Sequence, residues 1–154
     1  MLVKLYDLED DWSFIREYKK KDITIRKPIG AEKHNLIQWV KDHFGDAWAS
    51  ETDVCTGNVP ISCFVAVQNG SFAGFSCYDG TALGFFGPIG VAQEHRGKGL
   101  GKALLMSCLL DMKLKGYGYA IIGMTDKDKF YNHCAGAVVI PGSEGSVWKT
   151  WVKE

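Results

Sequence analysis

One glycine-rich run of this sequence has the composition of an anion-binding turn. Residues 93–101 read Q-E-H-R-G-K-G-L-G, and a long amphipathic stretch follows them. The glycines and cations in and beside the run are Gly97, Gly99, Gly101, Arg96, Lys98 and Lys102. Glycine lets the backbone approach a ligand and point successive N–H groups at it, and a helix N-terminus adds free donors and the positive end of a dipole. The run therefore suits a pyrophosphate, whereas the simpler interpretation is a tight turn with solvated cations around it.

The spacing of the glycines distinguishes between kinds of phosphate loop. A Walker A loop needs Gly-Lys followed by Ser or Thr to hold magnesium, but Ala103 follows Gly101-Lys102 here. A dinucleotide-binding turn needs G-x-G-x-x-G and an acidic residue at the end of the next strand. This run is G-x-G-x-G, and the strand expected at 119–124 ends in Met-Thr. The pattern that fits is R-x-x-G-x-G, from Arg96 to Gly101.

This R-x-x-G-x-G pattern resembles the acyl-CoA pyrophosphate loop of the GNAT superfamily of acetyl-CoA-dependent N-acetyltransferases. Three further features stand in the order and spacing of that family. Ile89-Gly90-Val91 resembles the end of its central strand, whose exposed backbone pairs with the pantetheine arm. Residues 119–122 are similar to the next, parallel strand, and residues 130–137, F-Y-N-H-C-A-G-A, to the short helix that carries a tyrosine. The resemblance extends from Leu83 to about Ile140.

The resemblance implies acetyl-CoA as co-substrate, no metal, and a role for each matching residue. The main-chain N–H of Ile89 would polarise the thioester carbonyl as it becomes an oxyanion, and Tyr131 would be the general acid that protonates the leaving thiolate. A phenol with its ordinary pKa of about 10 is protonated at pH 7 and can serve in this way. The residues expected to bind acetyl-CoA are Ile89, Val91, Arg96, Gly97, Lys98, Gly99, Gly101 and Lys102.

The strand before the glycine run contains residues that interrupt a sheet. Proline at Gly87-Pro88 removes a ladder donor, and Gly90 weakens side-chain packing. These residues predict a bulge at which the sheet opens to admit the pantetheine arm, with a functionless edge distortion as the alternative.

Fewer residues of the sequence indicate where the amine acceptor would bind. Glu51 lies in the segment that borders the acceptor pocket in GNAT proteins, and Asp79 ends a predicted strand, so each carboxylate is a candidate general base. A solvated or capping carboxylate is the alternative for both. Trp48, Phe85 and the adjacent Phe86 are candidate walls for an acceptor of apolar character, although aromatic residues more often belong to the core. The residues assigned to the acceptor pocket are Trp48, Glu51, Asp79 and Phe85.

Hydrophobic periodicity predicts the elements that must position these residues. Apolar stripes at helical spacing end before Gly45 and Gly116, and Asn69-Gly70 predicts a two-residue hairpin. Strands are expected at 2–5, 23–26, 62–68, 71–78, 83–91 and 119–124. Helices are expected from residue 10 and over 31–44 and 102–115, with a short helix and a loop between 46 and 60, and the family resemblance implies a further short helix over 130–137. This order predicts an α+β fold: a mixed, mostly antiparallel sheet with helices on both faces, a GNAT-like α/β/α sandwich.

Length and composition indicate a single domain that spans residues 1–154. Residues 1–22 read as a strand–helix extension, for which a family elaboration, a lid and a dimer contact all remain open. The formal net charge is zero, so nothing favours nucleic acid, and no apolar run is long enough to span a bilayer. Five cysteines without a C-x-x-C pair indicate reduced thiols in the cytoplasm, and four scattered histidines indicate no metal site.

These observations together favour an enzyme that moves an acetyl group from acetyl-CoA to a primary amine. The acceptor would be a small molecule or a peptide, and a homodimer is left open. The alternative is a catalytically inactive acyl-CoA-binding sensor or subunit. Retention of both the glycine run and Tyr131 favours the enzyme, since a binding module needs only the run.

Overall fold

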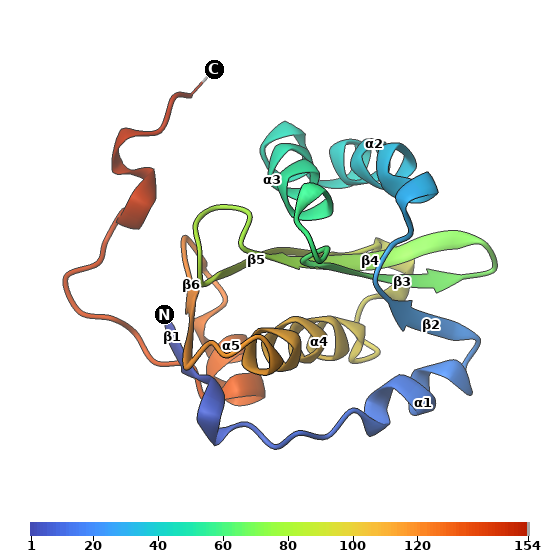
Figure 1. Cartoon of the computed structure of the whole chain (residues 1–154), viewed down its shortest axis with the longest axis horizontal. Coiled ribbons are helices and arrows are strands. Elements are labelled where there is room, and N and C mark those ends of the chain that lie inside the picture. The colour runs from blue at the N-terminus through green and yellow to red at the C-terminus, as the bar shows by residue number, and fades with distance from the viewer. Residues whose placement is uncertain (154) are drawn as a thin grey trace.

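The computed structural model describes residues 1–153, which form one six-stranded sheet (Figure 1). Its strands are β1 (Leu2–Lys4), β2 (Ile23–Arg26), β3 (Cys63–Gln68), β4 (Ser71–Tyr78), β5 (Phe85–Val91) and β6 (Tyr119–Ile122). They lie in the order β1-β6-β5-β4-β3-β2, and every neighbouring pair is antiparallel except β5 and β6, which are parallel. The mixed, mostly antiparallel sheet expected from the sequence is confirmed.

Helices cover both faces of this sheet. They are α1 (Ser13–Lys19), α2 (Lys33–Phe44), α3 (Asp46–Gly57), α4 (Leu100–Leu114) and α5 (Asp128–Ala135). Figure 1 shows α2 and α3 above the sheet, and α4 below it with α1 and α5 beside it. A short 3₁₀ helix, Ser146–Thr150, lies in the C-terminal segment at the edge of the molecule. None of the helices in residues 1–153 is long and apolar enough to cross a membrane.

The side chains of β3 divide between two cores because successive residues of a strand point to opposite faces. Phe64 and Ala66 join the core beneath the sheet, together with Leu104 of α4. Cys63 and Val65 join the core above it, which α2 and α3 cover. The sheet is thus buried on both sides along its centre, so its central strands are held rigidly.

The sheet opens between β5 and β6, next to a bulge in the pairing of β4 with β5. Ser76 lies opposite Ile89, but Tyr78 lies opposite Phe86, so β5 holds one more residue than β4 over this interval. The extra length falls at Gly87-Pro88, which confirms the predicted bulge. On the other side, β5 pairs with β6 only at Phe85 and Phe86, and the two strands separate beyond that point.

Helix α3 is longer than the sequence indicates. The stretch reads D-A-W-A-S-E-T-D-V-C-T-G, and its Thr, Val, Cys and Gly residues are weak helix formers, which is why a short helix and a loop were expected. Burial of Ala49, Thr52 and Cys55 against the sheet stabilises all twelve residues as helix. The hydroxyls of Thr52 and Thr56 donate to the carbonyls of Trp48 and Thr52, so neither buried hydroxyl lacks a partner.

The five cysteines are free thiols, and their burial predicts a graded reactivity. Burial raises the pKa of Cys77, Cys108 and Cys134, which lowers the thiolate fraction at neutral pH. Cys134 alone among the five is half-buried, while the others are fully buried. We expect one thiol to react with a disulfide reagent in the folded protein and all five after denaturation without reductant. Recovery of three or fewer thiols after denaturation of freshly purified protein would contradict this expectation.

Candidate functional site

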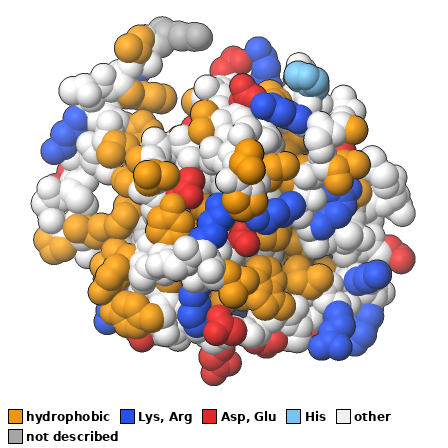
Figure 2. Space-filling model, in the orientation of Figure 1, with side chains coloured by type: hydrophobic (Ala, Val, Ile, Leu, Met, Phe, Trp, Pro, Cys, Tyr) orange, Lys and Arg blue, Asp and Glu red, His pale blue; other side chains and the backbone are white. Residues whose placement is uncertain are grey.

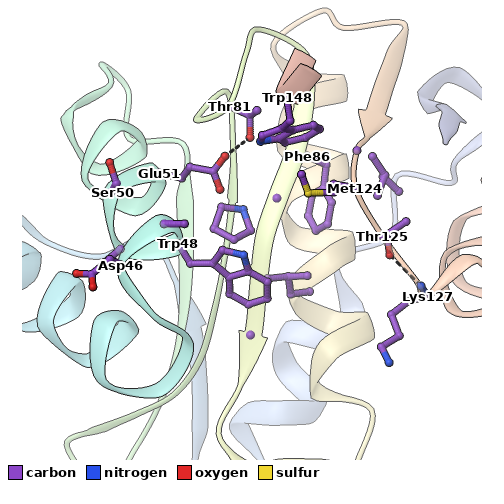
Figure 3. Close-up of a pocket in the computed structure, with 18 of the residues that line it drawn as sticks. Asp46, Trp48, Ser50, Glu51, Thr81, Phe86, Met124, Thr125, Lys127 and Trp148 are labelled. Carbon is purple, nitrogen blue, oxygen red and sulfur yellow. Dashed lines mark hydrogen bonds between the residues drawn. The ribbon is translucent and has the colours of Figure 1, made fainter. Parts of the chain in front are cut away.

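A cavity of about 1340 Å³ lies where β5 and β6 separate. It is lined by α3, β5, the loop after β6, α5 and the C-terminal segment, as the close-up shows (Figure 3). A pocket for one drug-sized ligand measures roughly 300–1000 Å³, so this cavity has room for a long ligand and a second, smaller one. Figure 2 shows hydrophobic side chains at the surface where the C-terminal segment meets the rest of the chain. Val147 and Trp151 are exposed hydrophobic residues of that segment.

The backbone of β5 presents unpaired donors to this cavity. The N–H of Ala92 donates to Ala73 of β4, so by the alternation of an antiparallel strand the N–H of Gly90 also points toward β4. The N–H groups of Ile89 and Val91 then point the other way, into the gap that β6 leaves open. The guanidinium Nε of Arg96 donates to the Val91 carbonyl at 2.9 Å, which agrees with that direction. Ile89 therefore has the donor that its predicted role requires.

The glycine run forms a turn that leads into α4. Gly97 and Gly99 have φ angles of 74° and 79°, a left-handed conformation that other residues adopt at a cost. No side chain caps α4, so the first N–H groups of the helix are free of side-chain acceptors. Donors, the positive end of the helix dipole and cations therefore converge at this turn, as an anion site requires.

The N-terminal helix holds the turn from outside. The hydroxyl of Tyr18 in α1 donates to the Lys98 carbonyl at 3.0 Å, and a Cβ on Gly99 would lie 3.0 Å from that hydroxyl. The ammonium of Lys98 donates to the Glu94 carbonyl at 3.2 Å. These contacts fix the shape of the turn, and they show that the extension before β2 packs against the candidate site.

Only some of the residues predicted to bind acetyl-CoA line the cavity. Ile89, Val91, Arg96 and Gly101 line it, whereas Gly97, Lys98, Gly99 and Lys102 do not. The second group is adjacent in sequence to Arg96 and Gly101, in the same turn and the first residues of α4.

Tyr131 lines the cavity and is only 7% exposed. Its ring packs edge-on against Phe86 and Phe130, with centroids 6.1 and 5.1 Å away. Burial, with the nearby charge of Asp126, raises the pKa of Tyr131 to about 12, although a hydrogen bond with Thr125 opposes the shift. The phenol is therefore fully protonated near neutral pH, which is the form that can donate a proton.

Glu51 and Trp48 project from α3 into the same cavity (Figure 3). One oxygen of Glu51 accepts a short hydrogen bond from the Thr81 hydroxyl, which orients the carboxylate. The indole of Trp48 stacks on Phe44, with centroids 5.4 Å apart and planes 26° apart, and it is 36% exposed. The structure thus brings both of these predicted acceptor residues to the cavity.

Asp79 and Phe85 do not line the cavity, which corrects their expected place. Asp79 closes the turn between β4 and β5: one oxygen accepts from the Gly84 N–H at 2.7 Å and the other from the Tyr117 hydroxyl at 2.8 Å. Its φ of 59° is that of a turn residue. Phe85 packs against Trp148 instead, and its neighbour Phe86 lines the cavity, because adjacent strand residues face opposite ways.

Several lining residues were not anticipated from the sequence. They are Thr81, Met124, Thr125, Trp148 and Trp151. The two tryptophans lie beside Val147 and Val152, and this short apolar and aromatic run is the signal that could have identified them. In residues 1–153 no group of three or more His, Cys, Asp or Glu side chains is placed to hold a metal ion.

Comparison with known proteins places the chain among acyltransferases. Residues 60–134 match the family model described as acetyltransferase (GNAT) domain. No curated protein matches the chain.

Three solved structures share the fold. The glucosamine N-acetyltransferase region of a fungal multi-domain β-N-acetylglucosaminidase is 17% identical, covers 87% of this chain and has a TM-score of 0.69, but this chain spans only 19% of its length. A GNAT-family protein from Xanthomonas campestris pv. campestris is 19% identical over 84% of this chain and 93% of its own, with a TM-score of 0.59. A GNAT acetyltransferase from Brucella melitensis, solved with acetyl-CoA, is 17% identical over 71% of this chain and 80% of its own, with a TM-score of 0.55.

Proposed function

This chain carries a GNAT acetyltransferase domain, and from that premise we propose that it transfers an acetyl group from acetyl-CoA to a primary amine. The Brucella protein was solved with acetyl-CoA, and the fungal region is described as a glucosamine N-acetyltransferase, so donor and amine acceptor both occur among proteins of this fold. For this chain, both properties are inferred from the residues that line its own cavity.

One observation carries the proposal: a single cavity joins an anion-binding turn, an unpaired strand donor and a buried, protonated phenol. Gly101 at the start of α4, Ile89 of β5 and Tyr131 of α5 all line this cavity. A phosphate-binding module would need only the turn. The strand donor and the phenol are the two groups that the departure of a thiolate from a thioester calls for.

Each residue then acts on one part of the reaction. The free N–H groups at Gly101 and the start of α4 bind the pyrophosphate, with Arg96 beside them. The N–H of Ile89 donates to the carbonyl oxygen as the amine nitrogen bonds to the carbonyl carbon and negative charge develops on oxygen. As the carbon–sulfur bond breaks, Tyr131 donates its proton to the thiolate, and the proton that the newly acylated nitrogen loses returns to the phenolate, directly or through water.

Glu51 supplies the base in this scheme. It is the carboxylate of the cavity that is oriented by a hydroxyl, through Thr81, rather than by a cation. The ammonium form of the acceptor loses its proton to Glu51, directly or through a water, and the neutral amine attacks. Glu51→Gln is expected to reduce turnover, whereas Glu9→Gln, at an exposed position away from the cavity, serves as the matched control.

The direct test supplies acetyl-CoA labelled in the acetyl group together with a panel of primary amines. Transfer is measured twice, as release of the CoA thiol and as the mass of the acetylated amine. We expect label on an amine and one thiol released for each acetyl group moved. Tight binding of CoA with neither transfer nor slow acetyl-CoA hydrolysis would overturn the proposal in favour of a binding module.

The raised pKa of Tyr131 makes a prediction about pH. With a pKa of about 12, the phenol stays in its proton-donating form throughout the neutral and mildly alkaline range. At pH 10 only about 1% of such a group is ionised, so kcat should show no alkaline decline from Tyr131 up to that point. The measurement is kcat at saturating substrates between pH 6 and pH 10, with circular dichroism to check folding. A fall in kcat near pH 9 that disappears in Tyr131→Phe would show that the phenol titrates there, which would contradict a pKa of about 12.

A further inference from the structure

The acceptor end of the cavity carries one carboxylate without a cation. The other two acids of α3 that line the cavity are paired: Asp46 with Lys41 at 2.7 Å and Asp53 with Lys33 at 2.9 Å. Within residues 1–153 no cationic side chain lies at ion-pair distance from Glu51, whose hydrogen-bond partner is the neutral Thr81 hydroxyl. A partly enclosed carboxylate in this state favours a cationic group of a ligand.

Two indoles stand on either side of that carboxylate. Figure 3 shows Glu51 pointing into the space between Trp48 of α3 and Trp148 of the C-terminal segment. Trp48 is backed by Phe44, and Trp148 lies over Gly123, where a Cβ would collide with its ring, and against the edge of Phe85. Because both indoles are held from behind, they offer fixed apolar surfaces to a flat group between them.

Few hydrogen-bonding side chains lie next to Trp148. A smaller pocket formed by α3, the turn after β4 and the C-terminal segment is lined by Ser50, Glu51 and Thr81 among apolar and aromatic residues, whereas Trp48 lines the larger cavity. An amino sugar brings several hydroxyls, and each one that leaves water without a partner opposes binding. A polyamine brings a second cation, and among the described residues Glu51 is the one carboxylate that lines this smaller pocket.

We propose that the acceptor is an arylalkylamine, a protonated primary amine joined by a short chain to a flat aromatic ring. The ammonium meets Glu51, and the ring lies between Trp48 and Trp148. This inference rests on the proposed function, because Glu51 then receives the proton of the same amine that is acetylated. The family assignment alone does not specify this class of amine.

The test compares four amines on the wild-type protein with saturating acetyl-CoA: phenethylamine, n-butylamine, glucosamine and 1,4-diaminobutane. A ring between two aromatic side chains is worth about tenfold in affinity, so kcat/KM for phenethylamine should exceed that of each other amine by about that factor. Trp148→Ala should remove the advantage over n-butylamine while the KM for acetyl-CoA stays unchanged. Trp148→Phe, which keeps a ring, should restore most of it.

A second measurement separates this inference from the proposed function. Calorimetric titration of the CoA-loaded protein with each amine reports acceptor binding without any turnover. Tightest binding of phenethylamine, lost in Trp148→Ala, supports the substrate class even in the absence of transfer. Equal or tighter binding of glucosamine or 1,4-diaminobutane overturns the class, and acetylation of either one would leave the proposed function standing.

Discussion

Replacing Tyr131 by phenylalanine is expected to lower kcat by about 10²–10⁴-fold, the usual contribution of general acid catalysis. Phenylalanine keeps the edge-on contacts with Phe86 and Phe130, so the fold of α5 and the wall of the cavity should survive. The KM for acetyl-CoA should change little, because the phenol acts as charge develops on sulfur rather than when the donor binds. Steady-state kinetics with the preferred amine measure both quantities.

Tyr117→Phe is the matched control for this variant. Tyr117 is a half-buried tyrosine whose pKa, like that of Tyr131, is raised to about 12, chiefly by burial, but its hydroxyl donates to Asp79 away from the cavity. Its loss should leave kcat unchanged. A Tyr131→Phe enzyme that turns over at the wild-type rate would remove the phenol from the mechanism and leave water as the acid.

Gly101→Glu is expected to weaken CoA binding by on the order of 100-fold or more, which corresponds to about 2.7 kcal/mol. Gly101 lies in the first turn of α4 with helical φ, and the nearest atoms to an added Cβ are 3.8 and 3.9 Å away, on Phe130 and Val91. The helix therefore accepts a side chain there, and an acidic residue in a first turn stabilises a helix. The carboxylate would instead occupy and repel the anion site. Isothermal titration with CoA measures the loss.

Two further variants make the result specific. Gly30→Glu adds the same side chain at an exposed position where no atom lies within 4 Å of the new Cβ, so CoA affinity should not change. Arg96→Gln should cost less than about tenfold, since the main-chain donors of the turn remain. Unchanged CoA affinity in a folded Gly101→Glu protein would show that the pyrophosphate binds elsewhere.

Local patterns predicted most of the fold, because the signals for its elements lie within a few residues of each other. Asn69-Gly70 indicated a two-residue turn, and both residues have the positive φ that such a turn requires. The bulge at Gly87-Pro88 followed from the loss of a ladder donor. Helix α3 was expected to be shorter because its stability comes from burial against the sheet, which propensity alone does not reveal.

The candidate site was predictable where a residue's role depends on its own strand or turn, and not where it depends on distant packing. Tyr131 and Ile89 reach the cavity as expected. Asp79 was expected to face the cleft, but its carboxylate accepts hydrogen bonds from the Gly84 N–H and the Tyr117 hydroxyl. Sequence alone does not show that these two donors hold the carboxylate in the turn and not in the cavity. Trp148 was missed because only the path of the C-terminal segment brings it near α3.

The hydrogen bond from Tyr18 to the Lys98 carbonyl links the stability of two parts of the chain. Thermodynamic reciprocity requires that, if the docked α1 favours the ligand-binding shape of the turn, a bound ligand favours the docked α1 by the same free energy. Local opening of α1 and release of the ligand are then coupled equilibria. Under that condition, a substitution in α1 that weakens its docking would lower the affinity of the turn for its ligand.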